Sequence, residues 1–209
     1  MEHILIDVLV KPQQALKHVK KDANFGNGLK VLVIWSVLSS VILSAAAFFQ
    51  AQTRFASAGI DATALLIDSF VSSEINFLLV FLIMAILVHV FLNAVNVKQK
   101  IGVFIGTLAY PFSAIIVLSS LFSVLIFLVS GITTQNDPIG FYIYLVLSAT
   151  MMGLAIYGFL LYTLTISEVY RTSMATAAAV IILMALVVLS VVASPELAQS
   201  FLQFSGTFI

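Results

Sequence analysis

The sequence contains no cysteine and few charged residues, which make up 9% of its 209 positions. Without cysteine, the chain has no disulfide, no thiol nucleophile and no cysteine-based metal site. The low content of charge excludes a water-soluble domain, in which about a quarter of the residues are charged. Basic and acidic residues number nine each, so no net positive charge favours nucleic acid as a partner.

Known catalytic motifs are also absent. No HExxH, GxSxG or P-loop spacing occurs, the three histidines are scattered, and no long apolar run contains two acidic residues. Hydrolytic, redox and ATP-driven chemistry therefore lack the residues that they need. We predict a protein that is not an enzyme, with no catalytic residue, no metal site and no cofactor.

What the chain has in excess is apolar residues, at 62% of the sequence with a mean hydropathy of +1.17. A membrane-spanning helix needs about 20 consecutive, mainly apolar residues. Five runs meet this length, and they predict an all-α, polytopic membrane bundle. The predicted spans are residues 29–49, 75–97, 101–130, 139–166 and 173–193, and residues 194–209 form a short tail.

Residues 1–28 precede the first span and form an amphipathic lead. Apolar residues recur at three- and four-residue spacing from Leu5 to Val19, which predicts helix, and Pro12 divides this helix into two. We expect the lead to lie in the membrane interface and its lysines to contact anionic lipid. These lysines are Lys11, Lys17, Lys20 and Lys21.

Basic residues fall almost entirely on one side of a five-span arrangement. The lead, the turn with Lys98 and Lys100, and the loop with Arg171 share that side, whereas the other side has only Arg54. The positive-inside rule then places the N-terminus in the cytoplasm and, after five spans, the C-terminus outside. Acidic residues, Glu74 among them, are expected outside the spans on that outer side.

The second predicted span contains the clearest polar pattern of the chain. His89, Asn93 and Asn96 are four and three residues apart, so they share one face of a helix. One interpretation is an intramembrane polar site for an ion, a proton or a lipid head group, completed by Tyr110 of the third span. The other is hydrogen bonding between helices near the end of the span, which Lys98 marks. The sequence leaves both interpretations open.

Two further features predict how the helices are shaped and packed. Pro111 in the third span predicts a kink or break, with the hydroxyls of Thr107 and Ser113 bonding the carbonyls that it frees. Ala149 and Gly153 in the fourth span form a small-residue pair. Such a pair permits the close approach of another helix, either from the same bundle or from a second copy.

Three stretches, which follow one another along the chain, carry a family resemblance. They are the lead from Ile6 to Leu16, the basic turn, glycine and Tyr-Pro element from Lys100 to Pro111, and the turn and small-residue helix from Leu164 to Ala178. Together they resemble the Yip domain family, five-span membrane proteins named for interaction with Ypt/Rab GTPases.

The resemblance implies a membrane protein of the prokaryotic type, in a prokaryotic cell membrane, without a settled activity. Eukaryotic members have a longer cytosolic N-terminal region and a motif like Asp-Leu-Tyr-Gly-Pro. At the matching place, from Asp7 to Pro12, this chain reads Asp-Val-Leu-Val-Lys-Pro. The Tyr-Gly pair is missing, which counts against GTPase binding.

Two functions fit these features. The first is a non-enzymatic membrane-organising or scaffold protein, which acts through lipid and through a membrane-protein partner or a second copy of the chain. The alternative is a small transporter or channel that uses the polar face of the second span. No charged residue lies deep in any predicted span, which favours the first function.

Overall fold

The computed structural model describes residues 2–54, 62–94, 98–132 and 138–193, and these residues form helices and no strand. Four helices, α3 to α6, are long and apolar enough to cross a membrane, and α7 contains a shorter apolar stretch, Met174–Leu186. The prediction of an all-helical membrane bundle is therefore confirmed for four spans. The helices are α1 (Glu2–Val10), α2 (Pro12–Asp22), α3 (Phe25–Arg54), α4 (Ala62–Ala94), α5 (Ile101–Ile132), α6 (Pro138–Tyr170) and α7 (Met174–Ala193).

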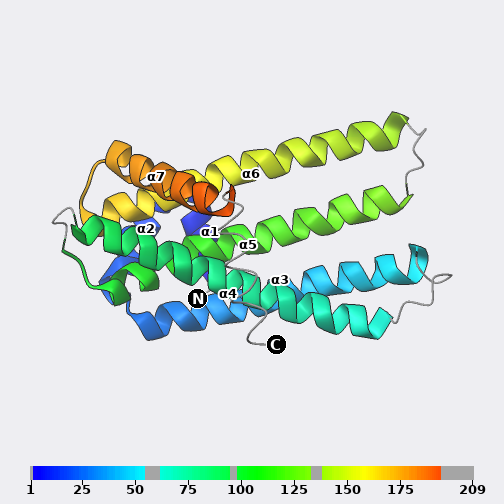
Figure 1. Ribbon diagram of the computed structural model, residues 1–209, viewed down its shortest axis with the longest axis horizontal. Helices are drawn as coiled ribbons and strands as arrows, with labels where there is room; N and C mark the ends of the chain where they lie inside the picture. The colour runs from blue at the N-terminus through cyan, green and yellow to red at the C-terminus, as the bar shows by residue number, and fades with distance from the viewer. Residues whose placement is uncertain (1, 55–61, 95–97, 133–137, 194–209) are drawn as a thin grey trace.

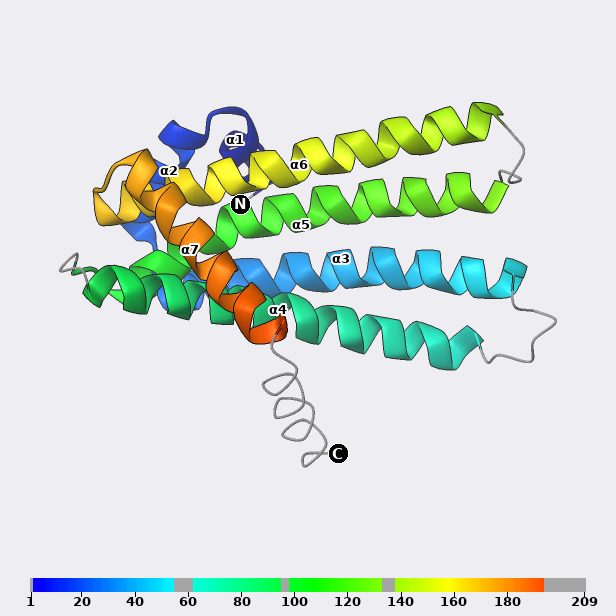
Figure 2. The same cartoon turned by 45° about the horizontal axis from the view of Figure 1, so that its top comes forward.

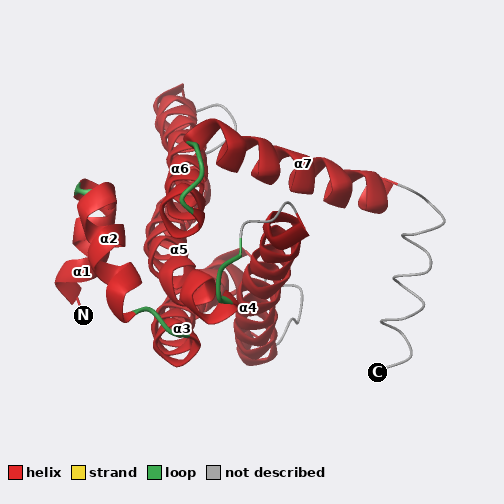
Figure 3. Cartoon of the chain, turned by 90° about the vertical axis from the view of Figure 1, so that its left-hand side faces the viewer, coloured by secondary structure: helices red, strands yellow, loops and turns green. Residues whose placement is uncertain are grey.

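The four long helices run side by side along the long axis of the molecule, whereas α7 crosses them obliquely (Figure 1, Figure 3). Helix α5 is central, since it packs against α1, α2, α3, α4 and α6. In its most apolar window of 18 residues 56% are buried, against 6% in the corresponding window of α6. We call the end of the bundle where α1 and α2 pack the lead end. The opposite end, where α4 begins at Ala62 and α6 at Pro138, is the far end (Figure 2).

The lead forms two short helices that separate at Lys11, as predicted from Pro12. Proline suits the first position of a helix because its missing N–H would have no partner there. The bundle covers part of the apolar surface of the lead: Val8 and Leu16 are fully buried, whereas Ile6 and Val10 of α1 are exposed. Helix α1 packs on α5, and α2 packs on α6 and α5. The lead is thus docked on protein, and the structure does not test the prediction that it lies in a membrane interface.

Helices α3 and α5 approach each other most closely at two glycines near the lead end. A Cβ atom on Gly28 would lie 2.5 Å from the Cα of Gly106, and one on Gly106 would lie 2.6 Å from the carbonyl oxygen of Asn24. Asn24 also caps α3, because its Oδ1 accepts a hydrogen bond of 2.9 Å from the N–H of Asn27. No larger residue fits at this crossing without a backbone shift.

Helix α5 continues through Pro111, so of the predicted kink or break the break is wrong, and the kink stays a prediction. Pro111 is buried, and the neighbouring helices hold the chain on both sides of it, which is how membrane bundles tolerate proline. The hydroxyl of Thr107 donates to the Val103 carbonyl at 2.8 Å. The carbonyl that Pro111 frees is that of Thr107 itself, so the predicted role of the Thr107 hydroxyl is not observed. The hydroxyl of Ser113 is buried and has no hydrogen-bond partner among the described residues, so its predicted role is not observed.

The small-residue pair of the fourth span does not mediate packing within this chain. A Cβ atom on Gly153 would meet nothing within 4 Å in the described part of the chain, so no described helix packs at that position. The close contact of α6 lies five residues further on, where a Cβ on Gly158 would meet Cγ2 of Ile115 at 3.4 Å. Contact of Gly153 with another copy of the chain stays a prediction.

Candidate functional site

A buried polar cluster near the lead end joins α4 to α6. The Nδ1 atom of His89 lies 2.6 Å from the hydroxyl oxygen of Tyr170, and the Nδ2 atom of Asn93 lies 2.8 Å from Nε2 of the same ring. His89 is 8% exposed and Tyr170 is 2% exposed. Both polar atoms of the imidazole are therefore satisfied by side chains of the protein.

Aromatic packing encloses this cluster. The ring of Phe104 on α5 stacks on His89 with centroids 6.5 Å apart and meets Tyr170 edge-on at 5.2 Å. If Asn93 donates to Nε2, then Nδ1 carries the hydrogen and donates to Tyr170, so the imidazole is neutral. Asn93 Oδ1 is buried without a partner among the described residues. The arrangement can hold α4 and α6 together and leaves one acceptor free.

The structure brings together only part of the predicted polar site. His89 and Asn93 do share a face and a hydrogen bond. Tyr110 lies six residues beyond Phe104 on α5, on a different face of the helix, and Asp22 of α2 is within electrostatic range of it. Asn96 falls outside the described residues. Tyr170, which the sequence argument missed, takes the place expected for Tyr110.

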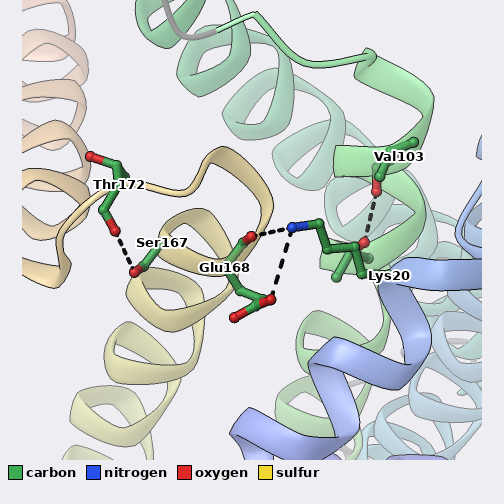
Figure 4. A network of polar contacts seen from close by, with 6 residues as sticks. Lys20, Val103, Ser167, Glu168 and Thr172 are labelled. Carbon is green, nitrogen blue, oxygen red and sulfur yellow. Dashed lines mark hydrogen bonds and ion pairs between the residues drawn. The ribbon is translucent and has the colours of Figure 1, made fainter.

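A second set of polar contacts fastens the lead to the end of α6 (Figure 4). The Nζ atom of Lys20 donates to the backbone carbonyl of Glu168 and lies 3.9 Å from its Oε1 atom. Beside this pair, the hydroxyl of Ser167 donates to the Thr172 carbonyl at 2.7 Å. Tyr157, also on α6, donates its hydroxyl hydrogen to the backbone carbonyl of Leu9 in α1. Side chains of α2 and α6 therefore hold both lead helices in place.

The lysines of the lead divide into two groups. Lys20 is partly buried and committed to Glu168, so it does not serve as a free lipid contact. The exposed lysines are Lys11, Lys17 and Lys21. Lys11 also borders an open groove of about 570 Å³ between the lead and α6. The groove is lined by Lys11, Pro12, Gln13, Gln14, Tyr157, Leu160, Leu161, Leu164 and Met174.

A third polar cluster lies inside the long helices and was not predicted. Helix α4 begins at Ala62, so Glu74 is part of the helix and of its apolar stretch, Leu66–Ala94, instead of preceding the span. Its carboxylate accepts hydrogen bonds from the hydroxyls of Ser36 at 2.8 Å and Ser40 at 3.1 Å, both on α3. The predicted second span begins one residue later, at Ile75, so the helix extends further toward its N-terminus than the predicted span and includes Glu74.

One signal in the sequence could have revealed this cluster. Ser36, Ser40 and Ser44 recur every four residues in the first span, which places three hydroxyls on one helix face. A row of hydroxyls inside a lipid-embedded helix needs polar partners on a neighbouring helix. Glu74 is the residue that supplies them for Ser36 and Ser40.

The fold and these clusters define the architecture of a multi-pass helical membrane protein whose polar groups lie between the helices. Within the described residues, no three His, Cys, Asp or Glu side chains gather closely enough to hold a metal ion. Comparison with protein-family models, with curated proteins and with solved structures finds no match to this chain.

Proposed function

We propose that this chain is a membrane scaffold of the Yip type, without enzymatic activity, that organises lipid and protein at its cytoplasmic face. The observation that carries the proposal is the docked lead. Val8 and Leu16 of the lead are buried against the bundle, whereas Lys11, Lys17 and Lys21 are exposed. A fixed basic surface beside a membrane attracts anionic lipid, at about 1 kcal/mol for each lysine near the bilayer.

The groove beside Lys11 supports a lipid contact of defined shape. Its α6 wall consists largely of leucines, and its lead wall consists of Lys11, Pro12 and two glutamines. An acyl chain fits against the first wall and an anionic head group against the second. We expect Lys11→Ala to lower the amount of phosphatidylglycerol that stays bound to the purified protein in native mass spectrometry. Gln13→Ala, which changes the same groove without removing charge, is the control and should retain it.

The proposal includes α7 as a fifth span, with the N-terminus in the cytoplasm and the C-terminus outside. Support comes from its length of 20 residues, about 30 Å of helix, which matches the hydrocarbon thickness of a bilayer, and all of these residues except Thr176 and Ser190 are apolar. The chain has no cysteine, so one introduced cysteine is a unique label. A membrane-impermeant maleimide should label Ala198→Cys in intact cells and Lys17→Cys only after permeabilisation. If Ala198→Cys is labelled only after permeabilisation, the C-terminus is cytoplasmic, and the chain has four spans instead of five.

The scaffold function is tested by capture from native membranes after cross-linking. We expect a reproducible protein partner with the wild type, and its loss with the double variant Lys17→Glu/Lys21→Glu. Asp68→Asn removes an exposed charge of α4 at the far end of the bundle, away from the lead, and should leave capture unchanged. If lipid alone is recovered from the wild type in repeated preparations, the scaffold proposal fails.

A small transporter is the second candidate, and the buried cluster of His89, Asn93 and Tyr170 is the observation that favours it. A polar cluster between spans is typical of ion and proton pathways. Against it stands the ring of Phe104, which packs on both His89 and Tyr170. A flux assay in liposomes, with His89→Leu as the variant, separates the two functions. Absence of flux for ions and lipid head groups in the wild type removes the transporter.

A further inference from the structure

Glu74 has a partly exposed side chain and lies far from both ends of its helix. It is twelve residues from the start of α4 and twenty from its end, which at 1.5 Å per residue is about 18 Å and about 30 Å. Its two hydrogen-bond donors agree with this depth, since Ser40 lies fourteen residues, about 21 Å, from the end of α3. A charged side chain at such a position is costly in a bilayer and is retained where it binds something.

No basic side chain is recorded as a partner of Glu74 among the described residues, where the ion pair observed is that of Lys20 with Glu168. Helix α4 packs against α3, α5 and α7. Helices α5 and α7 contain no acidic or basic residue, and Tyr110 is the only titratable group on them. The charged residues of α3 are Lys30, six residues before Ser36, and Arg54, fourteen after Ser40. On α4 itself the other titratable groups are Asp68, which is exposed, and His89, fifteen residues away.

The serine hydroxyls around Glu74 can serve both charge states of its carboxyl group. Ser36 Oγ lies 2.8 Å from Oε1 of Glu74 and also 3.2 Å from the backbone carbonyl of Val33. A hydroxyl has one hydrogen and two lone pairs, and its hydrogen rotates to suit its neighbours. When Glu74 is ionised, Ser36 donates to it. When Glu74 is protonated, Ser36 can accept from it and donate to Val33.

We propose that Glu74 is an intramembrane proton-binding site, in which Ser36 turns its hydroxyl hydrogen between the Glu74 carboxylate and the Val33 carbonyl. Binding forms one O–H bond on Oε1, and release breaks it, so the step needs no other reactant than a proton. Ser40 holds Oε2 in both states. Ser44, 2% exposed and without a partner among the described residues, lies one turn further along the same face of α3 and continues the hydroxyl row toward the far end. This site is independent of the proposed scaffold function.

The test uses dicyclohexylcarbodiimide, a lipid-soluble reagent that adds to a protonated carboxyl group and rearranges to a stable N-acylurea. Full-length protein in liposomes is treated at a series of pH values and analysed by intact-mass and peptide mass spectrometry. We expect one adduct, located on Glu74, whose yield falls as the pH rises. Glu74→Gln should abolish the adduct, and Glu168→Gln, which removes a carboxylate near the lead end, should retain it.

Two further measurements sharpen the test. Ser36→Ala removes one hydrogen bond that the carboxylate accepts and should raise the yield of the adduct at a fixed pH several-fold. Ser39→Ala, at a buried serine without a partner among the described residues, should not change this yield. Absence of labelling at Glu74 in the wild type, or labelling that does not depend on pH, overturns the proposal. Suppression by sodium at constant pH also overturns it, because a sodium ion would then be the ligand.

Discussion

At the lead end, α3 and α5 approach until two glycines touch, whereas toward the far end the apolar side chains of α6 are exposed on every side. The lead end also contains the His89 cluster and the contacts of Lys20 and Tyr157. The exposed side chains of the first turns of α6 are Ile139, Phe141, Tyr142, Ile143, Tyr144, Leu145 and Val146. The lead end is thus held together by contacts within the protein, whereas at the far end the side chains of α6 face outward.

This difference follows from the physics of helix association in lipid. Apolar side chains gain little by leaving lipid for protein, so helices associate through small residues and hydrogen bonds. The lead end has both, with Gly28, Gly106 and three groups of polar contacts. The first turns of α6 are rich in large apolar and aromatic residues, which are satisfied by lipid. We therefore expect substitutions of equal size to have unequal effects at the two ends.

Gly106→Ala is expected to have the largest effect. Its Cβ would lie 2.6 Å from a backbone carbonyl, which cannot move aside as a flexible side chain can. We expect a loss of about 3 kcal/mol in the free energy of unfolding, at the upper end of overpacking. Gly153→Ala, which meets nothing within 4 Å, should instead be neutral or raise stability by up to about 1 kcal/mol. Unfolding by SDS titration, followed by circular dichroism, measures both, and equal effects would contradict the comparison.

Tyr170→Phe is expected to have the next largest effect. It leaves Nδ1 of buried His89 without its partner, at a cost of about 1–2 kcal/mol. Tyr142→Phe removes the same hydroxyl from a residue of α6 that is 66% exposed, and it should change stability little. The same SDS titration measures the two variants. A loss with Tyr142→Phe as large as that with Tyr170→Phe would mean that the far end is held by hydrogen bonds as well.

The positions of the long helices were predictable because lipid imposes one simple requirement, about 20 apolar residues in sequence. The N-terminal end of α4 was not predictable, because a prediction based on apolar runs ends a span at the first charged residue. In the structure the helix continues through Glu74, since Ser36 and Ser40 satisfy its carboxylate. Whether a charged residue ends a span thus depends on the polar partners that a neighbouring helix offers. A single run of residues does not reveal these partners.

The candidate site shows the same limit. His89 and Asn93 were predictable as one face, because their spacing depends only on the helix itself. Tyr170 is 81 residues away in sequence, and its contact with His89 depends on how α4 and α6 lie against each other. The contact between Gly28 and Gly106 depends likewise on the alignment of α3 with α5. Sequence periodicity predicts the faces of helices, and only their packing decides which faces meet.

Lys20→Ala tests a weaker contact at the lead end. Its ion pair with Glu168 is partly exposed, so we expect a loss of at most about 1 kcal/mol. Trp35, the one tryptophan of the chain, lines a cavity of about 320 Å³ together with Leu5 and Leu9 of α1. Its fluorescence therefore reports whether the lead is docked. The emission maximum should shift at a lower SDS concentration in Lys20→Ala than in the wild type, and Lys17→Ala should match the wild type.

The smallest effect is expected at Arg171, which follows the last residue of α6 and has a φ of 53°, the left-handed region that glycine adopts without strain. The N–H of Thr172 bonds the carbonyl of Ser167 at 3.2 Å, the pattern of a helix that ends with a glycine-like residue. Arg171→Gly should raise the free energy of unfolding by up to about 1 kcal/mol, because left-handed backbone costs other residues about that much. Arg171→Ala keeps the strain and should bring no gain. If both variants lower stability equally in SDS titration, the arginine side chain stabilises the lead end more than its backbone strains it.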